Sequence, residues 1–199
     1  DILSKSKAIN ILSAARMFLF GARDVWFVVA LPVYLSTVFG WDFWMVGGFL
    51  AAWVIGYGIV QSMAPNITGK KHGHVPDGRA AFVWAALLAG LPAAIALGLS
   101  AGWSPHVVLL GGLMVFGVLF AVNSSLHSYL IVSYAKEDGV SLDVGFYYMS
   151  NALGRLLGTV LSGWIYQSYG LEACLWVSSA FVLLAALISI ALPRHAETI

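Results

Sequence analysis

Few ionisable side chains occur in this sequence, and four of them interrupt long apolar stretches: Arg16, Arg23, Asp24 and Arg155. Placing an ionisable side chain at the centre of a membrane helix costs roughly 2.5 to 3.5 kcal/mol on insertion scales, so each one needs a partner or a function. Arginine presents a planar fork of donors that matches phosphate and carboxylate groups with two hydrogen bonds. The three arginines therefore indicate recognition of an anion.

Arg16 and Arg23 are seven residues apart, which places them on the same face of a helix, two turns from each other. Two arginines on one face suit a multiply charged anion, and we predict that both contact it. Arg16 could instead extend toward the membrane surface or hold a gate, because it lies nearer the end of its apolar stretch. Asp24 directly follows Arg23, and adjacent helical residues point about 100° apart, so we expect Asp24 to pair with a residue of another helix.

A polar stripe follows one face of the apolar stretch around Arg155. Helical spacing brings four residues to that face: Tyr148, Asn151, Arg155 and Ser162. We predict that Arg155 contacts the anion, with Tyr148 and Asn151 beside it. The alternative is a structural salt bridge between Arg155 and Asp24.

Two further pairs of polar residues lie one turn apart on their stretches, Asn123 with His127 and Tyr57 with Gln61. Histidine titrates near neutral pH and can carry a proton or hydrogen-bond an oxyanion. Because Asp24 and His127 are the only aspartate and histidine well inside the apolar stretches, we predict that one of them takes part in proton coupling. A histidine that only satisfies a hydrogen bond is the alternative. Asn123 is predicted to bind the same anion as the arginines, whereas Tyr57 and Gln61 are weaker candidates for lining a cavity.

The elements that must position these residues follow from composition. Of 199 residues, 60% are apolar and 10% are charged, against about 25% charged in soluble domains, so the surface must face lipid. Crossing the hydrocarbon takes roughly 20 apolar residues in a helix, and six stretches satisfy this: 11–35, 44–64, 80–99, 107–132, 145–166 and 173–192. We therefore predict an all-α membrane protein, with a lead-in at 1–10, a six-helix transmembrane bundle at 11–192 and a tail at 193–199.

The remaining lysines and arginines all fall on one side of this arrangement, whereas the connections at 36–43, 100–106 and 167–172 contain none. The residues on the basic side are Lys5, Lys7, Lys70, Lys71, Arg79, Lys136 and Arg194. Because Lys and Arg favour cytoplasmic loops, both termini are predicted to be cytoplasmic. The net charge of +1 carries no basic cluster, which argues against nucleic acid as a partner. The single cysteine, Cys174, can form neither an internal disulfide nor a zinc site, and we expect no cofactor and no metal.

The order of helices with several polar residues and helices with almost none repeats along the chain. The first, second, fourth and fifth stretches hold the polar residues described above, whereas the third and sixth hold almost only apolar residues and a few serines. Because each unit has an odd number of helices, the second unit lies in the membrane with the opposite orientation to the first. Inverted three-helix repeats of this kind are a recurring construction of secondary transporters. We predict two such repeats, in which the third and sixth helices are outer supports that face lipid. Gly154 and Gly158 form a small-xxx-small pair, which is typical of close packing between membrane helices.

Three long segments resemble the C-terminal half of ArsJ-type permeases of the major facilitator superfamily. They are LSAARMFLFGARDVWFVVALPVYL, GGFLAAWVIGYGIVQSMAP and FAVNSSLHSYLIVSYAKEDGVSLDVGFYYMSNALGRLLGTVLSG. The resemblance implies half of a twelve-helix transporter of the bacterial inner membrane, with an N-terminal six-helix half as its partner. It also implies export of an organoarsenical, 1-arseno-3-phosphoglycerate, which a partner glyceraldehyde-3-phosphate dehydrogenase makes, and hence arsenate resistance. Such a cargo is a small polyanion, which fits Arg16, Arg23 and Arg155.

Another exported organic anion, an intramembrane enzyme and a structural subunit are the alternatives to this function. An intramembrane serine protease needs a serine activated by a histidine, together with an oxyanion hole. The serines closest to His127 in sequence lie on its own stretch, so they do not suggest such a pair. A scaffold subunit leaves the three arginines inside the spans unexplained. We therefore expect a transporter without enzymatic activity.

Overall fold

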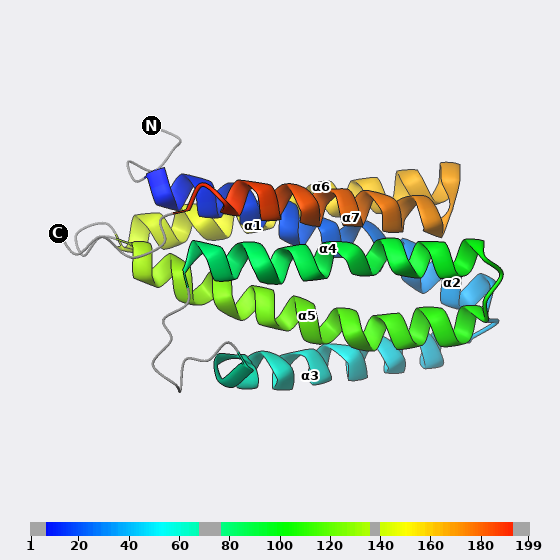
Figure 1. The fold of residues 1–199 in the computed structure, drawn as a ribbon. Coiled ribbons are helices and arrows are strands. Elements are labelled where there is room, and N and C mark those ends of the chain that lie inside the picture. Colours follow the sequence, from blue (N-terminus) through cyan, green and yellow to red (C-terminus); the bar gives the residue numbers. More distant parts are fainter. Residues whose placement is uncertain (1–6, 68–76, 136–139, 193–199) are drawn as a thin grey trace.

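A computed structural model describes residues 7–67, 77–135 and 140–192, and these residues are almost entirely helical, with no strand among them. The helices are α1 (Lys7–Phe27), α2 (Ala30–Thr37), α3 (Phe43–Ile67), α4 (Gly78–Ser100), α5 (Pro105–Tyr134), α6 (Val140–Tyr169) and α7 (Leu171–Ser189). The long helices run side by side as one bundle (Figure 1). The predicted all-α class is thus confirmed, whereas the tail at 193–199 and most of the lead-in fall outside the described residues.

Five segments are long and apolar enough to cross a membrane, with α1 and α2 together forming one span, Lys7–Thr37, and α3, α4, α5 and α7 forming the others. The one predicted span not among these five is the fifth, 145–166, which corresponds to α6; this helix has 30 residues and is therefore long enough. Its polar residues lower its mean hydropathy, so apolar character alone does not single it out. α6 nevertheless lies alongside the other long helices in the bundle (Figure 1).

The first predicted span, 11–35, is broken between Phe27 and Ala30 rather than continuous. Pro32 lies in the first turn of α2, where its missing N–H removes no hydrogen bond that the new helix needs. The backbone N–H groups of Val29 and Ala30 donate to the Ser162 hydroxyl oxygen of α6, at 3.2 and 3.0 Å. The break is therefore caused by proline and satisfied by a side chain of the neighbouring helix.

The helices pair in a pattern that is preserved when the two halves of the chain are exchanged. α1 packs against α6 and α7, and α5 packs against α3 and α4 in the same way. α4 and α7, which correspond to the third and sixth predicted spans and carry few polar residues, pack against each other. Exchanging the first three spans with the last three reproduces each of these contacts. This symmetry is the one expected of two three-helix repeats.

The start of α1 and the end of α7 lie at the same end of the bundle (Figure 1). Two basic residues of the described chain lie at this end, Lys7 at the start of α1 and Arg79 at the start of α4. At the other end, the connections at 38–42 and 101–104 contain no lysine or arginine. The remaining basic residues of the predicted cytoplasmic side fall outside the described residues, and the orientation stays a prediction.

Glycines let α1 and α6 approach each other closely. A Cβ atom added to Gly154 would overlap the backbone carbonyl of Met17, and one added to Gly158 would lie 2.8 Å from the carbonyl oxygen of Gly21 and 2.9 Å from Cβ of Asp24. The predicted packing role of Gly154 and Gly158 is confirmed. Gly158 also makes the space in which Asp24 lies.

Candidate functional site

Asp24 is the carboxylate at the centre of the candidate site. Its Oδ1 accepts a hydrogen bond from Nε of Arg23 at 3.0 Å, and its Oδ2 accepts one from Nε of Arg155 at 3.1 Å, so it joins α1 to α6. The Asp24 side chain is 3% exposed, against 16% for Arg23 and 55% for Arg155. Arg155 is thus the partner expected on another helix. The expectation that Arg23 and Asp24 do not meet is wrong, because the long Arg23 side chain turns back to its neighbour.

Arg16 is buried, and the groups that hold it are neutral. Its Nε donates to Oδ1 of Asn151 on α6 at 3.0 Å, and its Nη1 donates to the backbone carbonyl of Ser124 on α5 at 3.5 Å. The guanidinium carbon lies 3.7 Å from the centre of the Phe20 ring and 4.9 Å from that of the Tyr147 ring, within the range of cation–π attraction. No salt bridge joins Arg16 to a carboxylate of the described residues.

The ring of Phe20 lies against both arginines of α1. The guanidinium carbon of Arg16 lies 3.7 Å from the ring centre, and that of Arg23 lies 4.9 Å from it. The two guanidinium carbons can therefore be no further apart than these two distances added together. Phe120 of α5 supports the arrangement, with its ring centre 5.1 Å from that of Phe20. The two arginines therefore share one aromatic surface, as their seven-residue spacing predicts.

Positive charge exceeds negative charge in the middle of the bundle. Arg16, Arg23 and Arg155 lie there with Asp24, whereas the acidic residues of α6 and α7, Asp143 and Glu172, occupy the first turns of those helices. Three arginines and one aspartate leave two positive charges uncompensated within the described residues. An uncompensated charge at this depth is costly, so the arrangement favours a bound anion.

Asn123 and His127 are both buried on α5, but they contact different helices. Nδ2 of Asn123 donates to the backbone carbonyls of Trp84 on α4 and Leu119, at 3.0 and 2.8 Å, so Asn123 ties α5 to α4 instead of facing the arginines. His127 lies within electrostatic range of Arg16, and its Nδ1 has no hydrogen-bond partner in the described part of the chain. His127 therefore joins the arginine cluster, and Asn123 does not.

Of the remaining predicted residues, Tyr148 and Tyr57 lie within electrostatic range of Arg16. Tyr148 is half exposed, and its ring meets the ring of Tyr147 with centres 5.4 Å apart. Tyr57 of α3 is partly buried and lies within electrostatic range of Arg16. Gln61 lies one turn further along α3, and no hydrogen bond of its side chain is found among the described residues. A cavity-lining role for Tyr57 and Gln61 stays a prediction.

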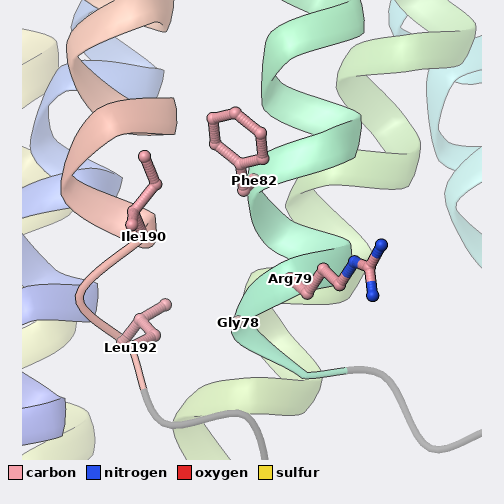
Figure 2. Close-up of a pocket in the computed structure, with 5 residues that line it drawn as sticks. All are labelled: Gly78, Arg79, Phe82, Ile190 and Leu192. Carbon is pink, nitrogen blue, oxygen red and sulfur yellow. The ribbon is translucent and has the colours of Figure 1, made fainter.

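An open pocket of about 380 Å³ lies at the end of the bundle where α4 begins and α7 ends, lined by Gly78, Arg79, Phe82, Ile190 and Leu192. Figure 2 shows Phe82 and Ile190 across from each other and the Arg79 side chain pointing away from them. Asp77 caps α4 here, because its Oδ1 accepts hydrogen bonds from two backbone N–H groups of the first turn, at 3.0 and 3.1 Å. This pocket is a feature of the helix ends and not of the arginine cluster.

One serine of the chain lies in a G-x-S-x-G match, Ser100 between Gly98 and Gly102. Its hydroxyl donates to Oε2 of Glu172 at 2.7 Å, at the end of the bundle opposite the start of α1 (Figure 1). His127 lies toward the other end of α5. The match therefore gives no serine and histidine pair of the kind that a hydrolase needs.

A family model described as Major Facilitator Superfamily matches residues 7–198 of this chain. The chain belongs to this superfamily. A curated relative, major facilitator superfamily domain-containing protein 10 of Mus musculus, is 33% identical over 124 residues, which are 62% of this chain and 26% of that protein. The match thus covers well under half of the relative's length, and no solved structure matches the chain. The six-span bundle is half of a major facilitator fold, as predicted.

Three polar residues of this major facilitator half-bundle received no role from the sequence: Ser13, Ser124 and Tyr147. Each lies one helical turn before a residue that was predicted, namely Arg16, His127 and Asn151 respectively. That spacing was the available signal. Serine and tyrosine are too common in membrane helices to indicate a site by residue type alone, so tertiary contacts were needed to find them.

Proposed function

We propose that this chain is the C-terminal six-helix half of a secondary transporter that exports a small polyanionic organic solute. The observation that carries the proposal is the charge imbalance in the interior. Asp24 neutralises one charge of the pair Arg23 and Arg155, and Arg16 is held only by neutral groups. A solute with two negative charges would balance the cluster.

The resemblance to ArsJ-type permeases supports 1-arseno-3-phosphoglycerate as the cargo, and another organic anion is the alternative. Such an ester has two anionic ends on a short carbon chain. The guanidinium groups of Arg16 and Arg23, which share the Phe20 ring, offer two cations at a comparably short separation. The same resemblance supports a functional link to a glyceraldehyde-3-phosphate dehydrogenase and a place in a bacterial inner membrane with both termini cytoplasmic.

The exposure of Arg155 supports an N-terminal six-helix half as the partner. An arginine side chain that is 55% exposed at mid-helix is costly against lipid, so we expect Arg155 to face a polar space shared with that second half. α3, which packs mainly on α5 and is largely exposed, offers further surface for the same contact. Alternating access arises when two such halves rock about a shared site.

Proton antiport is the proposed source of energy, with Asp24 or His127 as the coupling residue. Both are buried within the cluster, and both can change charge. Asp24→Asn and His127→Gln are each expected to flatten the pH dependence of export more than they weaken binding of the solute. An unchanged pH profile in both variants would remove them from this role.

The test of the proposed function is flux in everted membrane vesicles that contain this chain together with the N-terminal half. We expect uptake of 3-phosphoglycerate, a stable anionic probe, and arsenate resistance in cells that also produce the dehydrogenase. Vesicles that contain the 199 residues alone serve as the control and should show no uptake. Flux from the monomeric chain alone, or no anion uptake from the assembled halves, would refute the proposal.

A further inference from the structure

The three helices around Arg16 each contribute two polar residues one turn apart. The pairs are Ser13 and Arg16 on α1, Ser124 and His127 on α5, and Tyr147 and Asn151 on α6. One member of each pair belongs to the hydrogen-bonded group formed by Arg16, Ser124 and Asn151. The other member lies one turn nearer the end of the bundle where α1 begins, because α1 and α6 start at that end and α5 finishes there (Figure 1).

Ser13, His127 and Tyr147, which we call the inner layer, are almost completely buried. Oγ of Ser13, Nδ1 of His127 and the hydroxyl of Tyr147 have no hydrogen-bond partner among the residues that the structure describes. A buried polar atom without a partner destabilises the fold, because it has lost its hydrogen bonds to water. These three atoms come from three helices, each one turn from the hydrogen-bonded group that holds Arg16, and they point to a ligand that completes their hydrogen bonds.

The chemistry of the inner layer selects the kind of ligand. Two hydroxyls and an imidazole can all donate hydrogen bonds, and the guanidinium of Arg16 can only donate. We infer that the inner layer and Arg16 together bind an oxyanion group, that is, one phosphate, arsenate or carboxylate end of the exported solute. The inference rests on the proposed function and extends it to the residues that select the cargo.

A second cationic group lies close by, which defines the substrate class further. Arg23 faces the same Phe20 ring as Arg16, and Asp24 links it to Arg155. A solute with one anionic end on Arg16 therefore has a second cation, Arg23, on the same aromatic ring for its other end. The site fits a short organic molecule with an anionic group at each end better than one with a single anionic group.

The inner layer can open without loss of the closest helix contact in the bundle. α1 and α6, which carry Ser13 and Tyr147, pack tightly through their glycines, whereas α5, which carries His127, makes few contacts with either of them. Displacement of α5 would therefore expose the inner layer while α1 and α6 stay together. The main contacts of α5 are with α3 and α4.

The test uses the transporter assembled from this chain and the N-terminal half, with 3-phosphoglycerate as the two-ended probe and glycerol 3-phosphate as the one-ended probe. The wild type should bind 3-phosphoglycerate the more tightly. Ser13→Ala and Tyr147→Phe should each weaken its binding about tenfold, as expected for one lost hydrogen bond to a charged group. The same variants should keep or raise the thermal stability of the protein without ligand, because each removes an unpartnered buried hydroxyl.

Ser189→Ala and Tyr169→Phe are the matched controls and should leave binding unchanged, because Ser189 donates to its own helix and Tyr169 is exposed at the far end of α6. If both inner-layer variants bind 3-phosphoglycerate as tightly as the wild type and transport stays intact, this inference is overturned and the proposed function is not. Lower stability of Ser13→Ala and Tyr147→Phe without ligand would assign these residues a structural role and would overturn the inference. Altered pH dependence of these two variants with unchanged binding would assign them to proton coupling and would overturn it as well. A wild type that neither binds nor transports the probes would overturn the proposed function as well.

Discussion

Asp24 and Arg155 join α1 to α6 through a 3.1 Å ion pair in which the Asp24 side chain is buried and the Arg155 side chain is about half exposed. The two partners are not equivalent, because Asp24 also accepts a hydrogen bond from Arg23. Loss of the aspartate leaves two cations without a partner, whereas loss of Arg155 leaves the aspartate paired. The ion pair predicted as the alternative role of Arg155 is therefore present, and it leaves half of the Arg155 side chain free for another contact.

Asp24→Asn is expected to destabilise the bundle more than Arg155→Ala. Removing one partner of a buried ion pair costs about 3 to 5 kcal/mol, because the other charge is left uncompensated. Arg155→Ala leaves the carboxylate bonded to Arg23, so its effect should be clearly smaller. The midpoint of thermal unfolding of the purified protein in detergent measures the difference. Equal losses in the two variants would show that Arg23 alone cannot compensate Asp24.

Arg155→Lys is expected to keep expression and folding but to lose most export. Lysine keeps the charge, yet it lacks the planar fork that binds an oxyanion with two hydrogen bonds. Vesicle flux is the measurement, and Arg79→Lys, at the start of α4, is the matched control that should transport normally. One result would contradict a role of Arg155 in binding the solute. If both single alanine variants are inactive and the double change Arg155→Ala with Asp24→Ala restores export, then Arg155 is only a structural partner of Asp24.

Gly154→Ala is expected to destabilise the contact between α1 and α6. The added methyl group would overlap the carbonyl of Met17, and such overpacking costs about 1 to 3 kcal/mol. Gly163→Ala on the same helix is the control, since nothing lies within 4 Å of its added Cβ, and it should be neutral or slightly stabilising. Thermal unfolding compares the two. A Gly154→Ala protein as stable as the control would contradict the observed helix approach.

The orientation in the membrane predicts opposite accessibility for two introduced cysteines. In a Cys174→Ser background, Lys70→Cys should react only from the cytoplasmic side and Trp103→Cys only from the outer side. The lysines and arginines of the chain lie on the side of Lys70, whereas Trp103 belongs to a connection without basic residues. Labelling with an impermeant maleimide on intact cells tests this. Reaction of both cysteines from outside would overturn the six-span topology.

The sequence by itself determined the number of helical spans, the end of the bundle at which the basic residues lie, and the set of arginines. These features depend on hydropathy summed over about 20 residues and on residue type, which are local properties. Local reading also found the glycine pair of α6, because small residues four positions apart always share a helix face. It did not find the break before α2, although Pro32 marked the place, because the break also needed Ser162 of another helix to accept the freed N–H groups.

Only the tertiary structure decided which polar groups meet. Asn123 and His127 lie one turn apart, yet Asn123 bonds to α4 and His127 lies near Arg16, since α5 packs between helices on two sides. Asp24 bonds to its neighbour Arg23 as well as to Arg155, because side-chain length can overcome the 100° between adjacent positions. The inference that Ser13 and Tyr147 belong to the site depends on the rotation of α1 and α6 about their axes, which buries both residues. That rotation is set by which faces pack together, and no single helix sequence contains this information.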